Sequence, residues 1–191
     1  MRRSLVTLAL VALLAAPCTP ARADELATVR SKVAGAMQSA KSFVVTTTAP
    51  SFNVTMTFVA PDRYHSALAY NGTTRDVVLV GLVAYVSADG LVFRRTDAPP
   101  EVIAAEAQLR EVPVDRLLPD KTSGGKTWGQ FVTTSAGPQK DQHLTCTYDK
   151  KTYRINECSN EALLLAFSRY DDPANVVAIP ANVATPSPSP H

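Results

Sequence analysis

The sequence has few of the residues from which metal and catalytic sites are built. It contains three cysteines and three histidines among 191 residues. His65 and His143 have no neighbours at metal-ligand spacing, and His191 is the last residue, so we expect no metal site. No Gly-x-Ser-x-Gly turn occurs, which argues against the commonest hydrolase motif. We therefore predict that the protein is not an enzyme and uses no cofactor.

Two weaker features could indicate nucleotide binding or an enzyme. Gly125-Lys126-Thr127 resembles the end of a phosphate-binding loop, but that motif needs glycine at position 120, which is Asp. A hydrolase would require His65 or His143 to meet an acid and a nucleophile in one cleft. We keep the hydrolase as the third hypothesis, behind two kinds of binding protein.

An excess of charge is also missing from the part of the chain that we expect to fold. The sequence has 19 basic and 17 acidic residues, a net charge of +2. Removing residues 1–23 would remove Arg2, Arg3 and Arg22 and no acids, which leaves a net charge near −1. Such a balance gives no electrostatic basis for a nucleic-acid partner.

The N-terminus has the pattern of an export signal. Arg2 and Arg3 precede an uncharged apolar run over residues 4–16, and Ala21-Arg22-Ala23 fits a signal-peptidase site. We predict a signal peptide over 1–23, cleavage after Ala23, and a periplasmic or secreted protein. The alternative of lipid attachment at Cys18 is disfavoured because Pro17 directly precedes the cysteine.

The remaining chain predicts one domain and a short tail. Residues 24–183 suit a single folded domain, and residues 184–191 form a Pro/Ser-rich tail of low complexity. We expect a monomer.

Hydrophobic periodicity predicts an α+β fold. Apolar residues at steps of three and four indicate an amphipathic helix over 25–40, and apolar–polar alternation indicates strands from residue 42 onward. We predict strands at 42–48, 52–58, 63–70, 74–80, 82–87, 91–95, 127–134, 144–148, 153–158 and 162–170. A helix is expected at 102–110, and Pro113 and Pro119 confine further helix to one turn over 114–118. The strands should form a mainly antiparallel sheet with helices on one side.

Two cysteines, Cys146 and Cys158, remain after the signal peptide and lie on adjacent predicted strands. An oxidising compartment favours a structural disulfide between them. A simple tight turn would place Cys146 opposite residues 154–157, so pairing with Cys158 needs a bulge or a longer loop.

Apolar and aromatic residues gather on what we interpret as one face of the strands. They are Phe52, Val54, Met56, Phe58, Tyr64, Leu68, Tyr70, Tyr85 and Phe93. A sheet covered by helices needs such residues for its core, so an ordinary core is the simpler interpretation of this face.

Three segments resemble a known group of proteins. The stretch Met56-Thr57-Phe58-Val59-Ala60-Pro61-Asp62-Arg63-Tyr64, the stretch Val83-Ala84-Tyr85-Val86-Ser87-Ala88-Asp89-Gly90 and the stretch Phe167-Ser168-Arg169-Tyr170-Asp171-Asp172-Pro173 are similar to segments of the LolA, LolB and LppX lipoprotein carriers. The order of helix, meander, helical insertion and further strands is similar as well, over nearly all of residues 24–180.

This resemblance implies a curved antiparallel sheet that forms an incomplete β-barrel, covered by the N-terminal helix and a helical lid. The lid would be residues 97–118, with Val102, Ile103 and Leu109 facing the strands, and Trp128 and Phe131 would add to the apolar lining. The expected ligand is a lipid or the acyl chain of a lipoprotein, and a membrane-associated partner protein is compatible with that role. The polar contact that holds the lid closed cannot be placed, since Arg63 is out of register.

The sequence leaves one alternative open at the level of function. The same fold could be filled by its own side chains and act as a periplasmic or extracellular protein-interaction module. A cavity large enough for an acyl chain would favour the carrier.

Overall fold

The computed structural model describes residues 20–70, 72–134 and 142–184. Its elements are α1 (Pro20–Ser39), β1 (Ser42–Ala49), β2 (Phe52–Val59), β3 (Arg63–Tyr70), β4 (Thr73–Val80), β5 (Val83–Ser87), β6 (Arg94–Asp97), α2 (Pro100–Gln108), β7 (Arg116–Ser123), β8 (Lys126–Thr134), β9 (His143–Tyr148), β10 (Ile155–Ser159) and β11 (Leu164–Ser168). The signal peptide predicted over 1–23 lies mostly outside these residues, and so does nearly all of the 184–191 tail.

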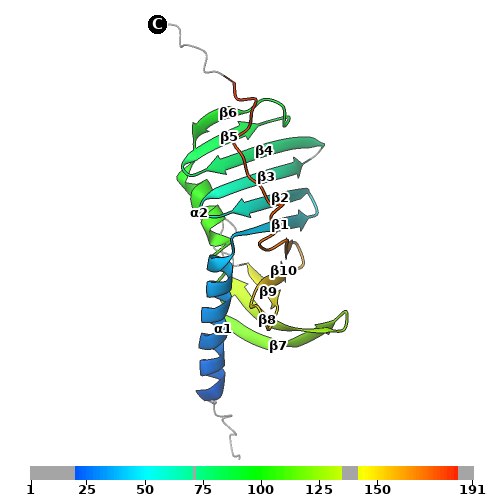
Figure 1. The fold of residues 1–191 in the computed structure, drawn as a ribbon. Helices are drawn as coiled ribbons and strands as arrows, with labels where there is room; N and C mark the ends of the chain where they lie inside the picture. Colours follow the sequence, from blue (N-terminus) through cyan, green and yellow to red (C-terminus); the bar gives the residue numbers. More distant parts are fainter. Residues whose placement is uncertain (1–19, 71, 135–141, 185–191) are drawn as a thin grey trace, which may run out of the picture.

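The strands form one sheet in which all neighbours are antiparallel. Their order is β6-β5-β4-β3-β2-β1-β11-β10-β9-β8-β7, so β6 and β7 are the two edges of an open, 11-stranded sheet (Figure 1). We call β1–β6 the first half and β7–β11 the second half. The predicted antiparallel sheet and N-terminal helix are confirmed, and β1 joins the two halves by pairing with β11.

Helix α1 forms because its apolar residues recur at helical spacing, and it buries that stripe. Val29, Val33 and Met37 are buried in the main core, together with Phe43 of β1 and Phe131 of β8. Arg30 donates two hydrogen bonds, of 3.0 and 2.8 Å, to the Val114 carbonyl oxygen. We call the side of the sheet that α1 and this core occupy the helix face.

The C-terminal segment covers part of the other side, which we call the opposite face. Residues 173–184 run across the strands towards β6 in Figure 1 and are named the strap here. Val177 packs with Val78 and Tyr85 in a second apolar cluster. At the far end of the strap, the Phe93 N–H donates to the Asn182 carbonyl oxygen at 2.9 Å.

The predicted disulfide is present, and the sheet accommodates it as expected. Cys146 and Cys158 are bonded and lie directly opposite each other on β9 and β10. The register shifts between Ile155 and Glu157, which supplies the bulge that the sequence required.

Two local predictions are wrong. Residues 114–118 do not form a helical turn, because β7 begins at Arg116 and pairs with β8. Pro119 is tolerated there because β7 is an edge strand, where a missing N–H need not break the ladder. The strand predicted over 91–95 is β6, Arg94–Asp97, since residues 87–92 form a turn around Asp89.

Neither helix of the described segments combines the length and the hydropathy that crossing a membrane requires.

Candidate functional site

The strand register brings the apolar residues of β2 and β3 together on the helix face. Phe58 lies opposite Tyr64, Val54 opposite Leu68, and Phe52 opposite Tyr70. Because side chains alternate across a pleated sheet, these residues and Met56 all project to the same side. The predicted lining residues that occupy this face are Phe52, Val54, Met56, Phe58, Tyr64, Leu68 and Tyr70; their contact with a ligand stays a prediction.

Burial decreases along this face away from the turn that joins β2 to β3. Phe58 has no exposed area, Tyr64 is 7% exposed and Tyr70 is 48% exposed. Val54 and Leu68, which lie between these ends, are partly exposed. The helix face of the first half thus has one packed end and one end where apolar side chains reach solvent.

The partly exposed apolar surface continues into the next two strands. Met56 lies opposite Ser66, which lies opposite Val77, and Val77 lies opposite Val86 of β5. Met56 and Val86 pack at the margin of the main core, and both are partly exposed. An apolar band therefore crosses β2–β5. It consists of Val54, Met56, Leu68, Val77 and Val86, and Ser66 of β3 is the polar position within it.

Helix α2 lies at the packed end of the face. Pro100 begins the helix, where its fixed φ and missing N–H are tolerated. Ile103 and Leu109 pack against the main core, as predicted for the lid segment, and Val102 is partly buried. The helix is shorter than the segment 97–118 that we expected to form the lid.

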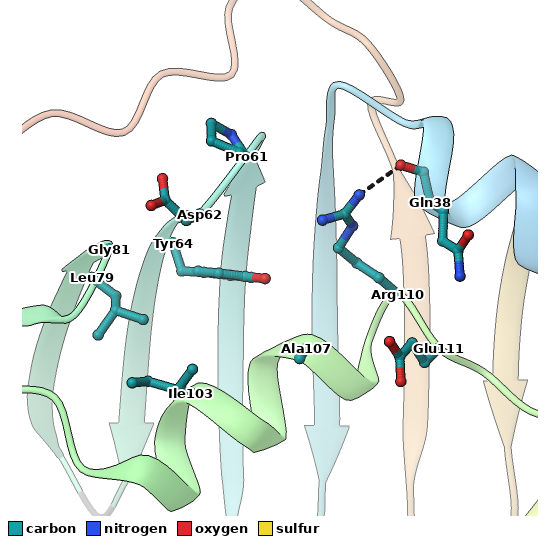
Figure 2. Close-up of a pocket in the computed structure, with 10 residues that line it drawn as sticks. All are labelled: Gln38, Pro61, Asp62, Tyr64, Leu79, Gly81, Ile103, Ala107, Arg110 and Glu111. Atoms are coloured by element: carbon teal, nitrogen blue, oxygen red, sulfur yellow. Dashed lines mark hydrogen bonds between the residues drawn. The ribbon is translucent and has the colours of Figure 1, made fainter.

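Two pockets border α2. One has a volume of about 430 Å³ and lies between the helix and the turns at the ends of β2–β3 and β4–β5 (Figure 2). Its lining residues are Gln38, Pro61, Asp62, Tyr64, Leu79, Gly81, Ile103, Ala107, Arg110 and Glu111. The other, of about 530 Å³, shares Ile103 and Ala107 with it and adds Leu82, Asp97, Ala98, Pro100 and Ala104. Space therefore adjoins the helix on two sides.

Arg110 ties the end of the α2 segment to α1 and β2. Its Nη2 donates a 2.6 Å hydrogen bond to the Gln38 carbonyl oxygen, drawn in Figure 2. Its guanidinium lies 4.8 Å from the centre of the Phe58 ring. Its Nε is buried and has no hydrogen-bond partner among the described residues. One side chain thus holds three elements together at the rim of the pocket.

No pattern in the sequence pointed to Arg110, and Arg63 was the arginine that we considered for the lid contact. Arg63 lies on the opposite face, where its Nη1 donates to the Val177 carbonyl oxygen of the strap at 3.2 Å. The Arg110 contact joins residues 72 positions apart through a backbone carbonyl. Such a contact leaves no periodic or motif signal in the sequence.

Three predicted lining residues lie elsewhere. Tyr85 and Phe93 belong to the apolar cluster under the strap, on the opposite face. Trp128 is next to Gly129, which shares the helix face with Phe131, so alternation places Trp128 on the opposite face. Its ring lies 3.9 Å from the Lys126 Nζ. The prediction that Tyr85, Phe93 and Trp128 line one surface together with Phe52 is therefore wrong.

Phe131 is on the helix face but in the second half. It has no exposed area and packs in the main core with Cys146 and Ile155. Its ring centre is 6.0 Å from that of Tyr148. Phe131 is thus a core residue of the second half.

The two histidines considered for chemistry lie in different halves of the sheet. His65 on β3 is 3.2 Å from Asp76 on the opposite face. His143 on β9 is 3.2 Å from the Thr134 hydroxyl. Within the described residues, no group of three or more His, Cys, Asp or Glu side chains could hold a metal ion.

No family model and no curated protein matches the sequence. Solved structures do match the fold. The Mycobacterium tuberculosis lipoprotein LppX superposes with a TM-score of 0.57 at 14% identity, over 80% of this chain and 98% of LppX. The chain has the LolA/LppX-like fold.

A second structure supports this assignment. LprF from Mycobacterium bovis superposes with a TM-score of 0.58 at 11% identity, over 84% of this chain and 98% of LprF. Almost the whole of each LppX-like structure is therefore matched. The resemblance predicted from three short segments is confirmed at the level of fold.

Proposed function

We propose that this protein is an exported, non-enzymatic carrier that binds a lipid, or the acyl chains of a lipoprotein or a similar apolar ligand. The ligand lies on the helix face of the first half, and α2 acts as the lid over its packed end. The observation that carries the proposal is the apolar band that remains partly exposed beside the α2 pockets. The LppX-like fold agrees with this role, since the sequence resembles lipid-carrying proteins of that fold.

The physical basis is the burial of hydrocarbon. Each methylene removed from water contributes about 0.8 kcal/mol, so an acyl chain gains by lying along Val54, Leu68 and Val77. The ligand also covers apolar area of these side chains that is exposed without it, and removing that area from water adds to the free energy of binding. Arg110 fixes one end of the α2 segment, which leaves rotation of the helix about that end as the way to open the site.

Export is part of this proposal. The 1–23 signal would deliver the protein to the periplasm or the exterior as a monomer, and Pro20–Ala23 would be removed from the start of α1. A membrane-associated protein would then load or unload the ligand.

The alternative is an interaction module, and the outer surface supplies an observation in its favour. Leu91 is 68% exposed, Val176 70% and Ile179 55%, all on the β5–β6 connection or the strap. Apolar side chains of this kind suit a protein partner. The two functions make opposite predictions about bound lipid.

The test is native mass spectrometry of the mature protein purified from an exporting host, followed by lipid extraction. We expect a co-purified lipid that is lost in V54D, since an aspartate in the apolar band opposes hydrocarbon. The matched control is T55D, on the next residue of β2, which is exposed and projects to the opposite face. Wild-type protein that is free of lipid and takes up no added fluorescent fatty acid would favour the interaction module.

A further inference from the structure

The helix face of the first half has a pronounced charge asymmetry. The only charged side chains at its described strand positions are Arg75 on β4 and Arg94 on β6. The acids of these strands, Asp76 and Asp97, project to the opposite face. Two positive charges therefore border the apolar band, and no strand carboxylate on this face neutralises them.

Both arginines are directly adjacent to apolar residues of the band. Arg75 lies opposite Leu68, and Arg94 lies opposite Val86. With strands about 4.8 Å apart and about 3.4 Å per residue, the two Cα atoms are separated by about 12 Å. Two extended arginine side chains can close that span from its two ends onto one group between them.

The guanidiniums are available for such a group. Both side chains are exposed, and neither has an ion-pair partner among the described residues. Asp89, in the connection between β5 and β6, is occupied by its own turn: its Oδ1 accepts hydrogen bonds from the Ser87 hydroxyl and the Leu91 N–H, both at 2.9 Å. Two unpaired arginines beside an apolar surface suit a ligand that carries both hydrocarbon and a negative charge.

We propose that Arg75 and Arg94 bind the phosphate of an anionic acyl lipid whose chains lie along the apolar band. This inference rests on the proposed function and names its ligand class. Arginine suits the task because its planar guanidinium donates two parallel hydrogen bonds to phosphate oxygens. The headgroup end of the site is then the solvent-exposed margin of β4–β6, and the chains extend towards Met56 and α2.

The experiment compares three probes on the mature, delipidated protein: phosphatidylglycerol, diacylglycerol with the same acyl chains, and glycerol 3-phosphate. Dissociation constants are measured by native mass spectrometry and by displacement of a fluorescent fatty acid. We expect wild-type protein to bind phosphatidylglycerol at least about tenfold more tightly than diacylglycerol, because charged hydrogen bonds to phosphate add affinity. Glycerol 3-phosphate, which lacks the chains, should bind far more weakly than either.

The variant R75Q/R94Q should lose the preference and bind both lipids with equal affinity. R75K/R94K should retain part of it, because the charge remains without the paired geometry. R95Q is the matched control, since Arg95 follows Arg94 on β6, is exposed, and lies on the opposite face. Circular dichroism of each variant establishes that it is folded, as expected for exposed positions.

The outcomes separate this inference from the proposed function. Equal binding of both lipids by wild-type protein, or an equal loss in R95Q, would overturn the arginine site and leave the carrier intact. Glycerol 3-phosphate binding as tightly as phosphatidylglycerol would overturn it too, since the chains would then contribute nothing. Binding of neither lipid would overturn the carrier itself.

Discussion

The two halves of the sheet use the same kind of strand but differ in how their helix faces are covered. In the second half, Phe131, Cys146 and Ile155 are all at most 1% exposed. In the first half, the fully buried part of the helix face ends near Phe58, and Leu68 remains partly exposed. A packed half is thus joined to a half whose interior surface is incompletely filled.

The helices account for the difference. Helix α1 has 20 residues and lies beside the strands of the second half in Figure 1, whereas α2 has nine and lies at one end of the first. The second half is reinforced further by the Tyr148–Tyr153 stack, with ring centres 5.8 Å apart, and by Lys32 over the Tyr153 ring. Longer cover buries the helix face of the second half, and shorter cover leaves apolar surface of the first half partly exposed.

The packing around Gly129 shows how completely the second half is filled. A Cβ at that position would lie 2.2 Å from the Tyr148 ring, so only glycine permits the ring to lie there. Burial raises the pKa of the Tyr148 hydroxyl. In the first half, by contrast, Val54, Leu68 and Val77 remain partly exposed.

The largest expected effect is a difference between the two halves in how far truncation of one apolar side chain lowers the free energy of unfolding. Phe131→Ala should lower the free energy of unfolding by about 3–5 kcal/mol, because it leaves a cavity in a packed core. Leu68→Ala should cost only about 1 kcal/mol, because its side chain is already partly exposed. Urea unfolding of both variants measures the difference, and equal losses would mean that the first half is as well packed as the second.

Removing the disulfide tests whether the second half is purely a scaffold. Cys146→Ala/Cys158→Ala opens a link between residues 12 apart, which should cost about 3 kcal/mol. Thermal unfolding measures the loss. Below the unfolding temperature of the variant, lipid binding by the first half should be unchanged, and weakened binding would show that the halves are coupled.

The smallest effect is a pH dependence confined to the second half. The hydrogen bond from Lys126 lowers the pKa of Asp149 to about 2, and the Thr152 N–H also contributes. A lowered carboxyl pKa stabilises the fold above its unfolded value of 3.8, and this contribution is lost as the pH falls from about 4 to about 2. Lys126 is 49% exposed, so Asp149→Asn should cost at most about 1 kcal/mol at pH 7.

Unfolding titrations of wild-type protein and Asp149→Asn across this range provide the measurement. The two stability curves should converge below pH 2, where the wild-type carboxyl is protonated. A constant difference down to that pH would assign the effect to the turn geometry around Asp149 and not to its charge.

Much of the fold followed from local patterns. The 25–40 helix, the 42–58 hairpin and the Cys146–Cys158 bond with its bulge were all predictable, because periodicity and turn residues act over short distances. Residues 114–118 were misassigned because two flanking prolines are compatible with a short turn as well as with an edge strand.

The site was predictable only in part. The alternating apolar residues of the β2–β3 hairpin, from Phe52 to Tyr70, were placed on one face correctly because a single hairpin fixes their register. Tyr85 and Trp128 were not, since their faces depend on the pairing of later strands, where a shift of one residue moves a side chain to the other side. Arg110 had no signal, because its partners become neighbours only in the folded chain.

The sequence alone determined the alternation that makes a two-faced antiparallel sheet, the helical stripe that covers it, and the cysteines that staple it, because these depend on residues near one another in the chain. The tertiary structure decided which strands α1 covers, that the strap occupies the opposite face, and that Arg75 and Arg94 border the same apolar band. Those arrangements depend on the order of strands in the sheet and on long-range packing, which local sequence patterns do not specify.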